Sequence, residues 1–339
     1  MIYSFGLLLP VVSTEFGAGK TEASLAHTLM SLMTLGSGPV VAEATKKFGH
    51  RVVSMAGTLL AMAGLAAAGL YISLTNEPAI EVLYLCVGIL TGFGFGLMYL
   101  PAMDIVERYF HKRLGLANGI AAAGSGLGQF IIAPLLQLIQ QNLGLADTLF
   151  CLVGLVAIAL PFVLIYKTPS VSGREGGESE NAPALDDEGE SWVERKVVTG
   201  WCGSYLSLLR CRAVLFLLTS YFLLDLGISS VPVFTTDRAE GAGIPGPTAS
   251  YLLSTMGATN CLGRALWGPV MDRYANLFTL ARFPKRTFLL AFAVFFTNAC
   301  SVLLGQLSPS LPGQLAYSAL FGASFGAVMS CIPALIKKV

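Results

Sequence analysis

Residues 109–128 read YFHKRLGLANGIAAAGSGLG, a basic turn followed by a segment rich in glycine and alanine. Small residues recur in this segment at a spacing of four, at Gly115, Gly119 and Ala123 and again at Gly124 and Gly128. Small residues on one helix face let the backbones of membrane helices approach closely. The stretch therefore predicts a membrane span that begins just after a charged, water-exposed loop.

The composition of the whole chain agrees with a membrane protein. Of its 339 residues, 54% are hydrophobic and only 12% are charged, and the mean hydropathy is +0.69. A soluble domain carries about 25% charged residues. The 37 glycines are typical of closely packed membrane helices. The net charge of +1 gives no bulk attraction to nucleic acid, so nucleic-acid binding is not expected.

Continuous apolar runs predict an all-α polytopic fold, because a bilayer core of about 30 Å needs about 20 apolar residues in a helix. The runs are too long and too continuous for barrel strands. The first is too short to span, so we expect the start of its helix to be missing; no signal peptide is expected. The ten runs lie at roughly 1–13, 24–44, 52–74, 82–103, 115–138, 148–166, 213–235, 249–271, 287–307 and 313–336.

Basic residues predict the orientation. One set of loops holds 18 lysines and arginines, whereas the other holds only Lys20 and Arg238. The excess of basic residues marks the cytoplasmic side. Residues 167–212 are rich in glycine, serine and acidic residues at their start, and they predict a largely disordered cytoplasmic linker. The linker divides a bundle at 1–166 from a second bundle at 213–339.

A weak internal repeat relates the two bundles. Gly38 and Pro39 in GSGPVV match Gly268 and Pro269 in LWGPVM, and GFGFGLMYLPA at 92–102 matches ASFGAVMSCIPA at 323–334. Each match is six spans apart, which indicates two halves of the same orientation. Coincidence is the alternative, since glycine and proline are common in membrane helices. A full set of two such halves would hold twelve spans, so about two are expected beyond Val339.

Tyr109–Gly128 closely resembles the signature between the fourth and fifth helices of the monocarboxylate transporter family (solute carrier family 16) of the major facilitator superfamily. YSFGLLLPVVSTEFG at 3–17 and the GP and KKFGHR motifs at 38–51 are similar to the first two helices of that family. The resemblance covers nearly the whole chain apart from the linker. It implies the major facilitator fold, with about ten of twelve helices present, and a carrier in the plasma membrane.

Arg264 is the strongest candidate for a substrate-binding residue. It lies seven residues from the cytoplasmic end of its run, about 10 Å deep. A charge inside a span costs at least about 2.5 kcal/mol and usually faces a cavity or a partner, although an arginine can also snorkel to the interface. The planar guanidinium can donate two parallel hydrogen bonds to a carboxylate. The resemblance implies that Arg264 is the eighth-helix arginine that binds the substrate anion.

The chain departs from the proton-coupled members of that family at two places. Asn260 replaces an aspartate one turn before Arg264, and Tyr3 replaces a lysine in the first helix. The usual proton-coupling pair is therefore not intact. Asp225, in the middle of the run at 213–235, is the candidate replacement acid; it either pairs with Arg264 in the empty carrier, faces the cavity in protonated form, or has a structural role. The resemblance adds further cavity positions: Ser31, Thr34 and Leu35, and Phe325 with Ser330.

The signature loop carries charges of both signs. Asp104 and Glu107 either pair with the basic loop at 46–51 and hold a gate closed, or form part of a solvated loop. The basic members of the signature loop are Arg108, Lys112 and Arg113.

The leading functional hypothesis is a carrier of lactate- or pyruvate-type monocarboxylates that works by alternating access, with or without proton symport. A facilitative uniporter for aromatic amino acids and a non-transporting membrane sensor or scaffold are the alternatives. No clustered nucleophiles, metal ligands or phosphate-binding motif indicate an enzyme, a metal site or a cofactor. The expected partners are a small organic anion, a proton, the lipid bilayer and a single-span immunoglobulin-type glycoprotein of the kind that some family members need.

Overall fold

The computed structural model describes residues 2–75, 78–110, 114–166, 219, 231–278, 299–300, 303, 305 and 310–336. Throughout these ranges the chain is helical or forms short turns, and it contains no strand, which confirms the all-α prediction. The predicted linker at 167–212 lies outside the described residues, as do most of the runs at 213–235 and 287–307. Their predicted structure therefore stays a prediction.

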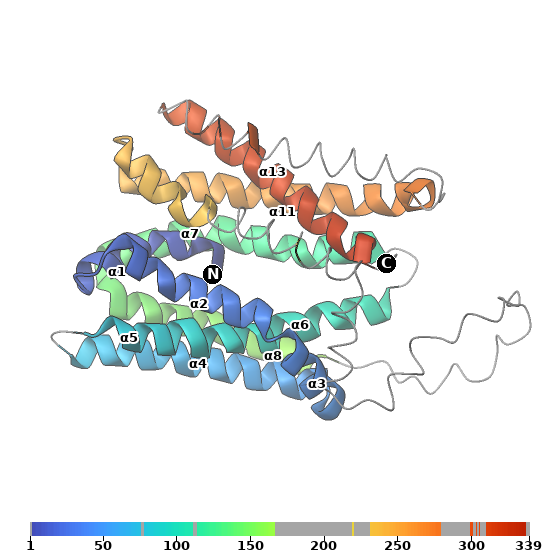
Figure 1. The fold of residues 1–339 in the computed structure, drawn as a ribbon, viewed down its shortest axis with the longest axis horizontal. Coiled ribbons are helices and arrows are strands. Elements are labelled where there is room, and N and C mark those ends of the chain that lie inside the picture. Colours follow the sequence, from blue (N-terminus) through green and yellow to red (C-terminus); the bar gives the residue numbers. More distant parts are fainter. Residues whose placement is uncertain are drawn as a thin grey trace, which may run out of the picture. The chain divides into compact units, whose positions relative to one another are not determined.

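The N-terminal part of the chain forms consecutive helices that run back and forth (Figure 1). The turns at 16–19 and 241–245 lie at one end, here called the Lys20 end, and Gly49 and Phe110 lie at the opposite end, here called the His50 end. The helices are η1 (Ile2–Leu7), α1 (Leu9–Glu15), α2 (Lys20–Gly36), α3 (Gly38–Phe48), α4 (His50–Leu74), α5 (Ile80–Leu83), the π-helical η2 (Tyr84–Thr91), α6 (Gly92–Tyr109), α7 (Leu114–Ala157) and α8 (Ala159–Leu164).

Four helical segments in the described part of the chain are long and apolar enough to cross a membrane, and a bent pair makes a fifth. The four are His50–Leu74, Ile80–Tyr109, Gly115–Gln140 and Asn142–Leu164, and the bent pair is Lys20–Gly36 with Gly38–Phe48. They coincide with five of the predicted runs, from the second to the sixth. The shorter apolar helix Phe5–Glu15 corresponds to the first run.

Proline and glycine explain where these helices bend. The predicted continuous run at 24–44 is broken at Ser37, where α2 and α3 meet at an angle of 47°. Pro39 lacks a backbone N–H, so one helical hydrogen bond is missing here and a bend is favoured. Gly144 has a φ of +79° inside α7, and it divides α7 into two spans. A residue with a Cβ rarely adopts that φ.

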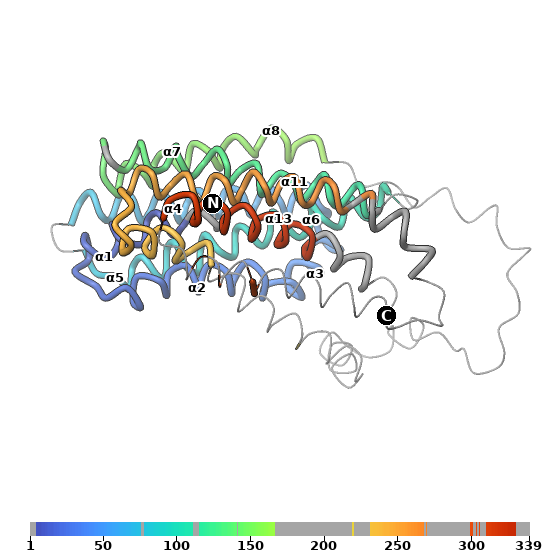
Figure 2. The backbone as a smooth tube through the Cα atoms, turned by 90° about the horizontal axis from the view of Figure 1, so that it is seen from above, coloured from blue at the N-terminus to red at the C-terminus, as the bar shows by residue number. Residues whose placement is uncertain are grey.

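The C-terminal part consists of helical residues 231–241, α11 (Gly246–Phe278) and α13 (Leu311–Ile336). Both long helices contain a predicted run, 249–271 and 313–336 respectively. In Figures 1 and 2, α11 runs alongside α7 and α13. Gly126 of α7 and Gly257 of α11 face each other there, because a Cβ built on either would lie 2.8 Å from the carbonyl oxygen of the other.

The two parts of the chain repeat one packing pattern. In each, two glycines four residues apart on one helix sit against the backbone of two residues four apart on another, leaving no room for a Cβ. The contacts are Gly92–Met30 and Gly96–Thr34 between α6 and α2, and Gly322–Met256 and Gly326–Asn260 between α13 and α11. This pattern relates the two parts in a different register from the repeat predicted from the sequence, so that repeat stays a prediction.

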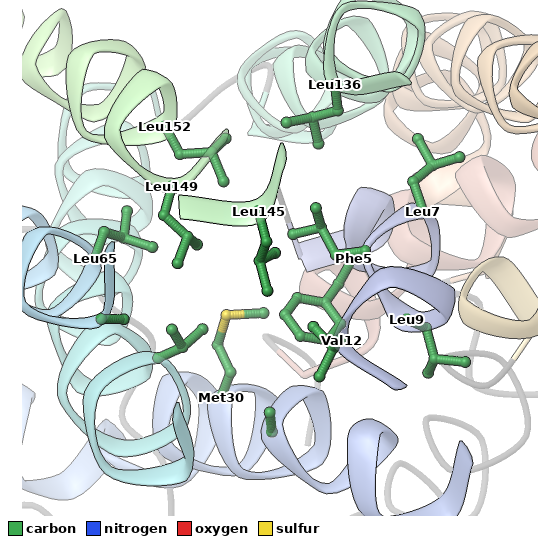
Figure 3. Close-up of a cluster of buried hydrophobic side chains, with 14 of the residues drawn as sticks. Phe5, Leu7, Leu9, Val12, Met30, Leu65, Leu136, Leu145, Leu149 and Leu152 are labelled. Atoms are coloured by element: carbon green, nitrogen blue, oxygen red, sulfur yellow. The ribbon is translucent and has the colours of Figure 1, made fainter. Parts of the chain in front are cut away.

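A hydrophobic core joins the helices near the Lys20 end (Figure 3). Phe5 and Leu9 from the first helical segments, Met30 from α2, Leu65 from α4 and Leu149 from α7 are each at most 2% exposed. Val233 and Leu253 from the C-terminal part belong to the same cluster. Burial of such side chains favours folding by about 1.5–3 kcal/mol each in water. Within a bilayer, close packing of the side chains provides much of the stabilisation instead.

Candidate functional site

Arg264 is buried where α11 packs against α13. Its side chain is 5% exposed, its Nε donates a 2.9 Å hydrogen bond to Oδ1 of Asn260, and its guanidinium carbon lies 5.7 Å from the ring centroid of Phe325. Gly326 permits this arrangement, because a Cβ there would lie 2.9 Å from the backbone nitrogen of Arg264. The structure thus places Arg264, Asn260 and Phe325, three of the predicted site residues, in direct contact.

Asn260, which the resemblance predicts to replace an acid, contacts Arg264 through its amide group. It is fully buried, and its oxygen accepts the hydrogen bond from Arg264. Its Nδ2 has no hydrogen-bond partner among the described residues. A buried unpaired donor costs about 1–3 kcal/mol. Asn260 therefore orients Arg264 without neutralising its charge, and it holds a second donor available to an acceptor.

Phe325 is one end of a buried aromatic column on α13. Tyr317, Phe321 and Phe325 recur every four residues and are each at most 2% exposed. Their ring centroids are 6.2 and 6.1 Å apart in succession. Arg238 lies over Tyr317 at the Lys20 end of the column, with its guanidinium carbon 4.5 Å from the ring centroid. Each end of the column therefore carries a cation–π contact with an arginine.

The N-terminal and C-terminal helices touch at the Lys20 end. Gly6 in η1 meets the backbone carbonyl of Val233 so closely that a Cβ would not fit. Thr236 donates a 3.2 Å hydrogen bond from its hydroxyl to the carbonyl oxygen of Gly6. Lys20 at the start of α2 makes a 2.7 Å ion pair with Asp237. These backbone and side-chain contacts join the two parts of the chain at this end.

Glu240 adds a further acid beside that ion pair. Its pKa is raised above the usual value, mainly by partial burial and also by the negative charge of Asp237. The positive charge of Lys20 lowers the pKa and offsets part of this rise. At the Lys20 end, basic and acidic side chains therefore lie close to one another, and most of them remain in contact with solvent.

At the His50 end, Asp104 contacts two basic side chains. Its Oδ2 lies 2.6 Å from Nε2 of His50 and accepts a 2.9 Å hydrogen bond from Nε of Arg108. His50 is 4% exposed and is the first residue of α4, whereas Glu107 is exposed. Asp104 and Glu107 belong to the last turns of α6, not to a loop. Lys112 and Arg113 lie outside the described residues.

The remaining predicted site residues have separate environments. Thr34 is committed to packing, since its hydroxyl bonds to the carbonyl oxygens of Met30 and Gly92. The hydroxyl oxygen of Ser31 is buried without a partner among the described residues, whereas Leu35 is 42% exposed. The side chains of Tyr3 and Ser330, and all of Asp225, lie outside the described part of the structure.

Sequence reasoning missed His27, Arg238 and the Lys20–Asp237 pair as functional candidates. His27 is 7% exposed on α2, stacks on Phe5 at 5.5 Å between ring centroids, and has an Nδ1 with no partner among the described residues. The sequence did single out Lys20 and Arg238, because they are the two basic residues of the loops predicted at this end. The other charged residues of these loops are acidic. Their contacts depend on tertiary packing that no local pattern shows.

The sequence matches a family model and several known proteins along most of its length. The family model described as Major Facilitator Superfamily matches residues 1–339. The chain is 29% identical to monocarboxylate transporter 4 of Rattus norvegicus over 93% of its own length and 61% of that protein. It is 28% identical to monocarboxylate transporter 12 of Homo sapiens, over 96% of the chain and 63% of that protein. The chain thus spans about three fifths of the length of the curated relatives it matches.

Proposed function

The chain belongs to the Major Facilitator Superfamily, and on that premise we propose that it carries small monocarboxylates across the plasma membrane by alternating access. The substrates are of lactate or pyruvate type. The observation that carries the proposal is the buried Arg264, whose Nε donates to Oδ1 of Asn260, next to Nδ2 of Asn260, which has no partner among the described residues. A substrate carboxylate can accept hydrogen bonds from both groups.

Burial strengthens this recognition. A charge-assisted hydrogen bond in a site shielded from water is stronger than the same bond at the surface. Neutral Asn260 leaves the positive charge of Arg264 in place for an incoming anion. The names of the similar proteins, which are monocarboxylate transporters 4 and 12, support the same substrate class.

In the proposed cycle the two halves rock around a site near the middle of the membrane. The distribution of lysine and arginine supports a cytoplasmic His50 end, an external Lys20 end and a cytoplasmic linker. The closed contacts at the Lys20 end then correspond to a state that is shut toward the outside. The His50–Asp104–Arg108 contact at the other end joins α4 to α6 within the N-terminal half.

The direct test is uptake into vesicles by the full-length protein, with labelled lactate, pyruvate and tryptophan, with and without a pH gradient. The proposal predicts saturable uptake of lactate or pyruvate and inhibition of uptake by other monocarboxylates. Saturable uptake of tryptophan alone would instead support an aromatic amino acid carrier. Failure of the correctly inserted protein to transport any of the three would contradict the proposal. The test includes coexpression of a single-span glycoprotein that delivers the protein to the cell surface.

The Lys20–Asp237 pair predicts a charge-reversal effect on the carrier. Lys20→Asp places two carboxylates at the closed end, so we expect the closed state to lose population and external labelling of a cysteine placed at Val233 to become several-fold faster. Adding Asp237→Lys to that variant should restore slow labelling. Neutral Lys20→Gln should change labelling less than about threefold, because exposed ion pairs contribute only about 0.2–1 kcal/mol. Equal labelling in all variants would contradict the role of the pair as a gate.

Asp225 is proposed as the acid that replaces the family's missing proton carrier, and its position lies outside the described residues. If it binds the coupling proton, Asp225→Asn should flatten the dependence of uptake on a pH gradient while exchange of substrate at equal pH persists. Uptake of labelled substrate with and without the gradient measures this, and Asp147→Asn, which removes an exposed acid from α7, serves as the control. Unchanged transport at every pH would remove Asp225 from the mechanism.

A further inference from the structure

We propose that Arg238 forms a second carboxylate-binding station, on the Lys20 side of Arg264, which receives the substrate anion before it reaches Arg264. The inference rests on the proposed function and adds a site to it. The two arginines cap opposite ends of the Tyr317–Phe321–Phe325 column. Phe325 follows Tyr317 by eight positions on α13, about 12 Å at a helical rise of 1.5 Å per residue.

The contacts of Arg238 leave its charge uncompensated. Its Nη2 donates a 2.7 Å hydrogen bond to Oε1 of Gln314, and its guanidinium lies over the ring of Tyr317, so both of these partners are neutral. Its Nε is buried and has no acceptor among the described residues. Guanidinium Nε and Nη2 together form one edge of the fork that binds a carboxylate with two parallel hydrogen bonds.

The surrounding groups hold the guanidinium in position. Nε2 of Gln314 donates a 2.7 Å hydrogen bond to the carbonyl oxygen of Gly305, which fixes the amide that binds Arg238. A Cβ at Gly305 would lie 2.9 Å from both Nη atoms, so the glycine makes room for the guanidinium. The hydroxyl groups of Tyr317 and Thr235 are 3.5 Å apart, which ties the column to the helix that carries Arg238. Because the guanidinium group is already held in place, it loses less side-chain entropy when it binds an anion than a mobile arginine would.

The nearby acids do not supply the missing carboxylate. Asp237 is adjacent in sequence, but its Oδ1 is bonded to Lys20. Glu240 approaches Gly246 at the start of α11, since a Cβ at Gly246 would lie 2.8 Å from its Oε1. Neither acid makes an ion pair with Arg238 at 4 Å or less among the described residues. Arg238 is therefore a partly exposed cation positioned for an external anion.

Opening of the Lys20 end would expose this station. Thr236 and Asp237, which contact Gly6 and Lys20 of the other half, lie on the same helical segment as Arg238 and immediately precede it. Any motion that separates the halves at this end must break those two contacts. The same motion therefore uncovers Arg238 and the Tyr317 end of the column, and an anion from outside meets Arg238 first.

The test compares Arg238→Gln, Arg238→Lys and Lys20→Gln in vesicles of known orientation, with labelled lactate as the probe or, if the wild type prefers it, pyruvate. KM and the maximal rate are measured separately for uptake and for efflux. Arg238→Gln is expected to raise the external KM about tenfold, which corresponds to about 1.4 kcal/mol, with less than a twofold change in efflux KM. Arg238→Lys, which keeps the charge, should lie within about threefold of the wild type.

Lys20→Gln is the matched control, because it removes the same charge from the same end of the molecule. We expect it to alter the two KM values by similar small factors. An unchanged external KM in Arg238→Gln, or equal loss in both directions with a lower melting temperature, would overturn the station and assign Arg238 a structural role. If the wild type transports lactate and Arg264→Gln does not, the proposed function survives that result; absence of transport by the wild type would instead contradict the proposed function.

Discussion

Arg264→Gln is expected to reduce the rate of carboxylate uptake at least about a hundredfold. Removing one partner of a buried, hydrogen-bonded charge pair costs about 2–5 kcal/mol, and about 1.4 kcal/mol corresponds to a factor of ten. Glutamine keeps a polar side chain beside Oδ1 of Asn260 but donates no fork to a carboxylate. Initial rates of labelled lactate or pyruvate uptake, normalised to inserted protein, measure the effect.

Two controls give that result its meaning. Arg264→Lys keeps a positive charge without the planar fork, so we expect a partial loss, roughly tenfold, and weaker discrimination between carboxylates. Arg51→Gln removes an exposed arginine from the start of α4 and should change uptake less than twofold. If Arg264→Gln transported at near wild-type rates, the anion site would have to lie elsewhere.

Gly257→Leu is expected to prevent the chain from folding into a monodisperse membrane protein. A Cβ at residue 257 would lie 2.6 Å from the backbone nitrogen of Phe130 and 2.8 Å from the carbonyl oxygen of Gly126. Backbone atoms cannot move aside as a flexible side chain can, so α7 and α11 would have to separate. Adding even a few methylene groups to a packed interior costs about 1–3 kcal/mol, and a leucine adds more than that.

Gly126→Leu should have the same effect, because Gly126 faces the same contact from α7. Gly124→Leu is the matched control on that helix, since no atom lies within 4 Å of a Cβ built there. Size-exclusion profiles and melting temperatures of the detergent-solubilised proteins measure the difference. Equal behaviour of the variants at residues 124 and 257 would contradict the close packing of α7 on α11.

Much of the fold was predictable, because span length and hydropathy act locally. The runs at 52–74 and 115–138 correspond to α4 and to the first span of α7, since each is a continuous apolar segment long enough for the bilayer. The break between α2 and α3 was not predicted, although Pro39 signals it. The run of residues 24–44 is apolar enough to appear continuous, and hydropathy alone does not show how a proline redirects a helix.

The site was predictable only in part. Arg264 is conspicuous because it is a charge inside an apolar run, and Asn260 and Phe325 follow from the resemblance to a known family. The position of Arg238 over Tyr317, and the pairing of Lys20 with Asp237, join residues more than 75 positions apart. Local periodicity carries no information on which helices are neighbours, so these contacts required the tertiary structure. Thr34 bonds through its hydroxyl to the carbonyl oxygens of Met30 and Gly92, and its place in the substrate site stays a prediction.

The central claim is that a positive charge at position 264 meets the substrate in a water-accessible site. The most direct test places a cysteine there, as Arg264→Cys, in a background whose native cysteines are replaced and which still transports. Modification with a methanethiosulfonate reagent then attaches either an ethylammonium or an ethylsulfonate group through a disulfide bond. We predict that the inactive cysteine variant regains measurable uptake with the ammonium group and none with the sulfonate. A thiol that never reacts in the inserted carrier, or recovery that is independent of the sign of the added charge, would contradict the account.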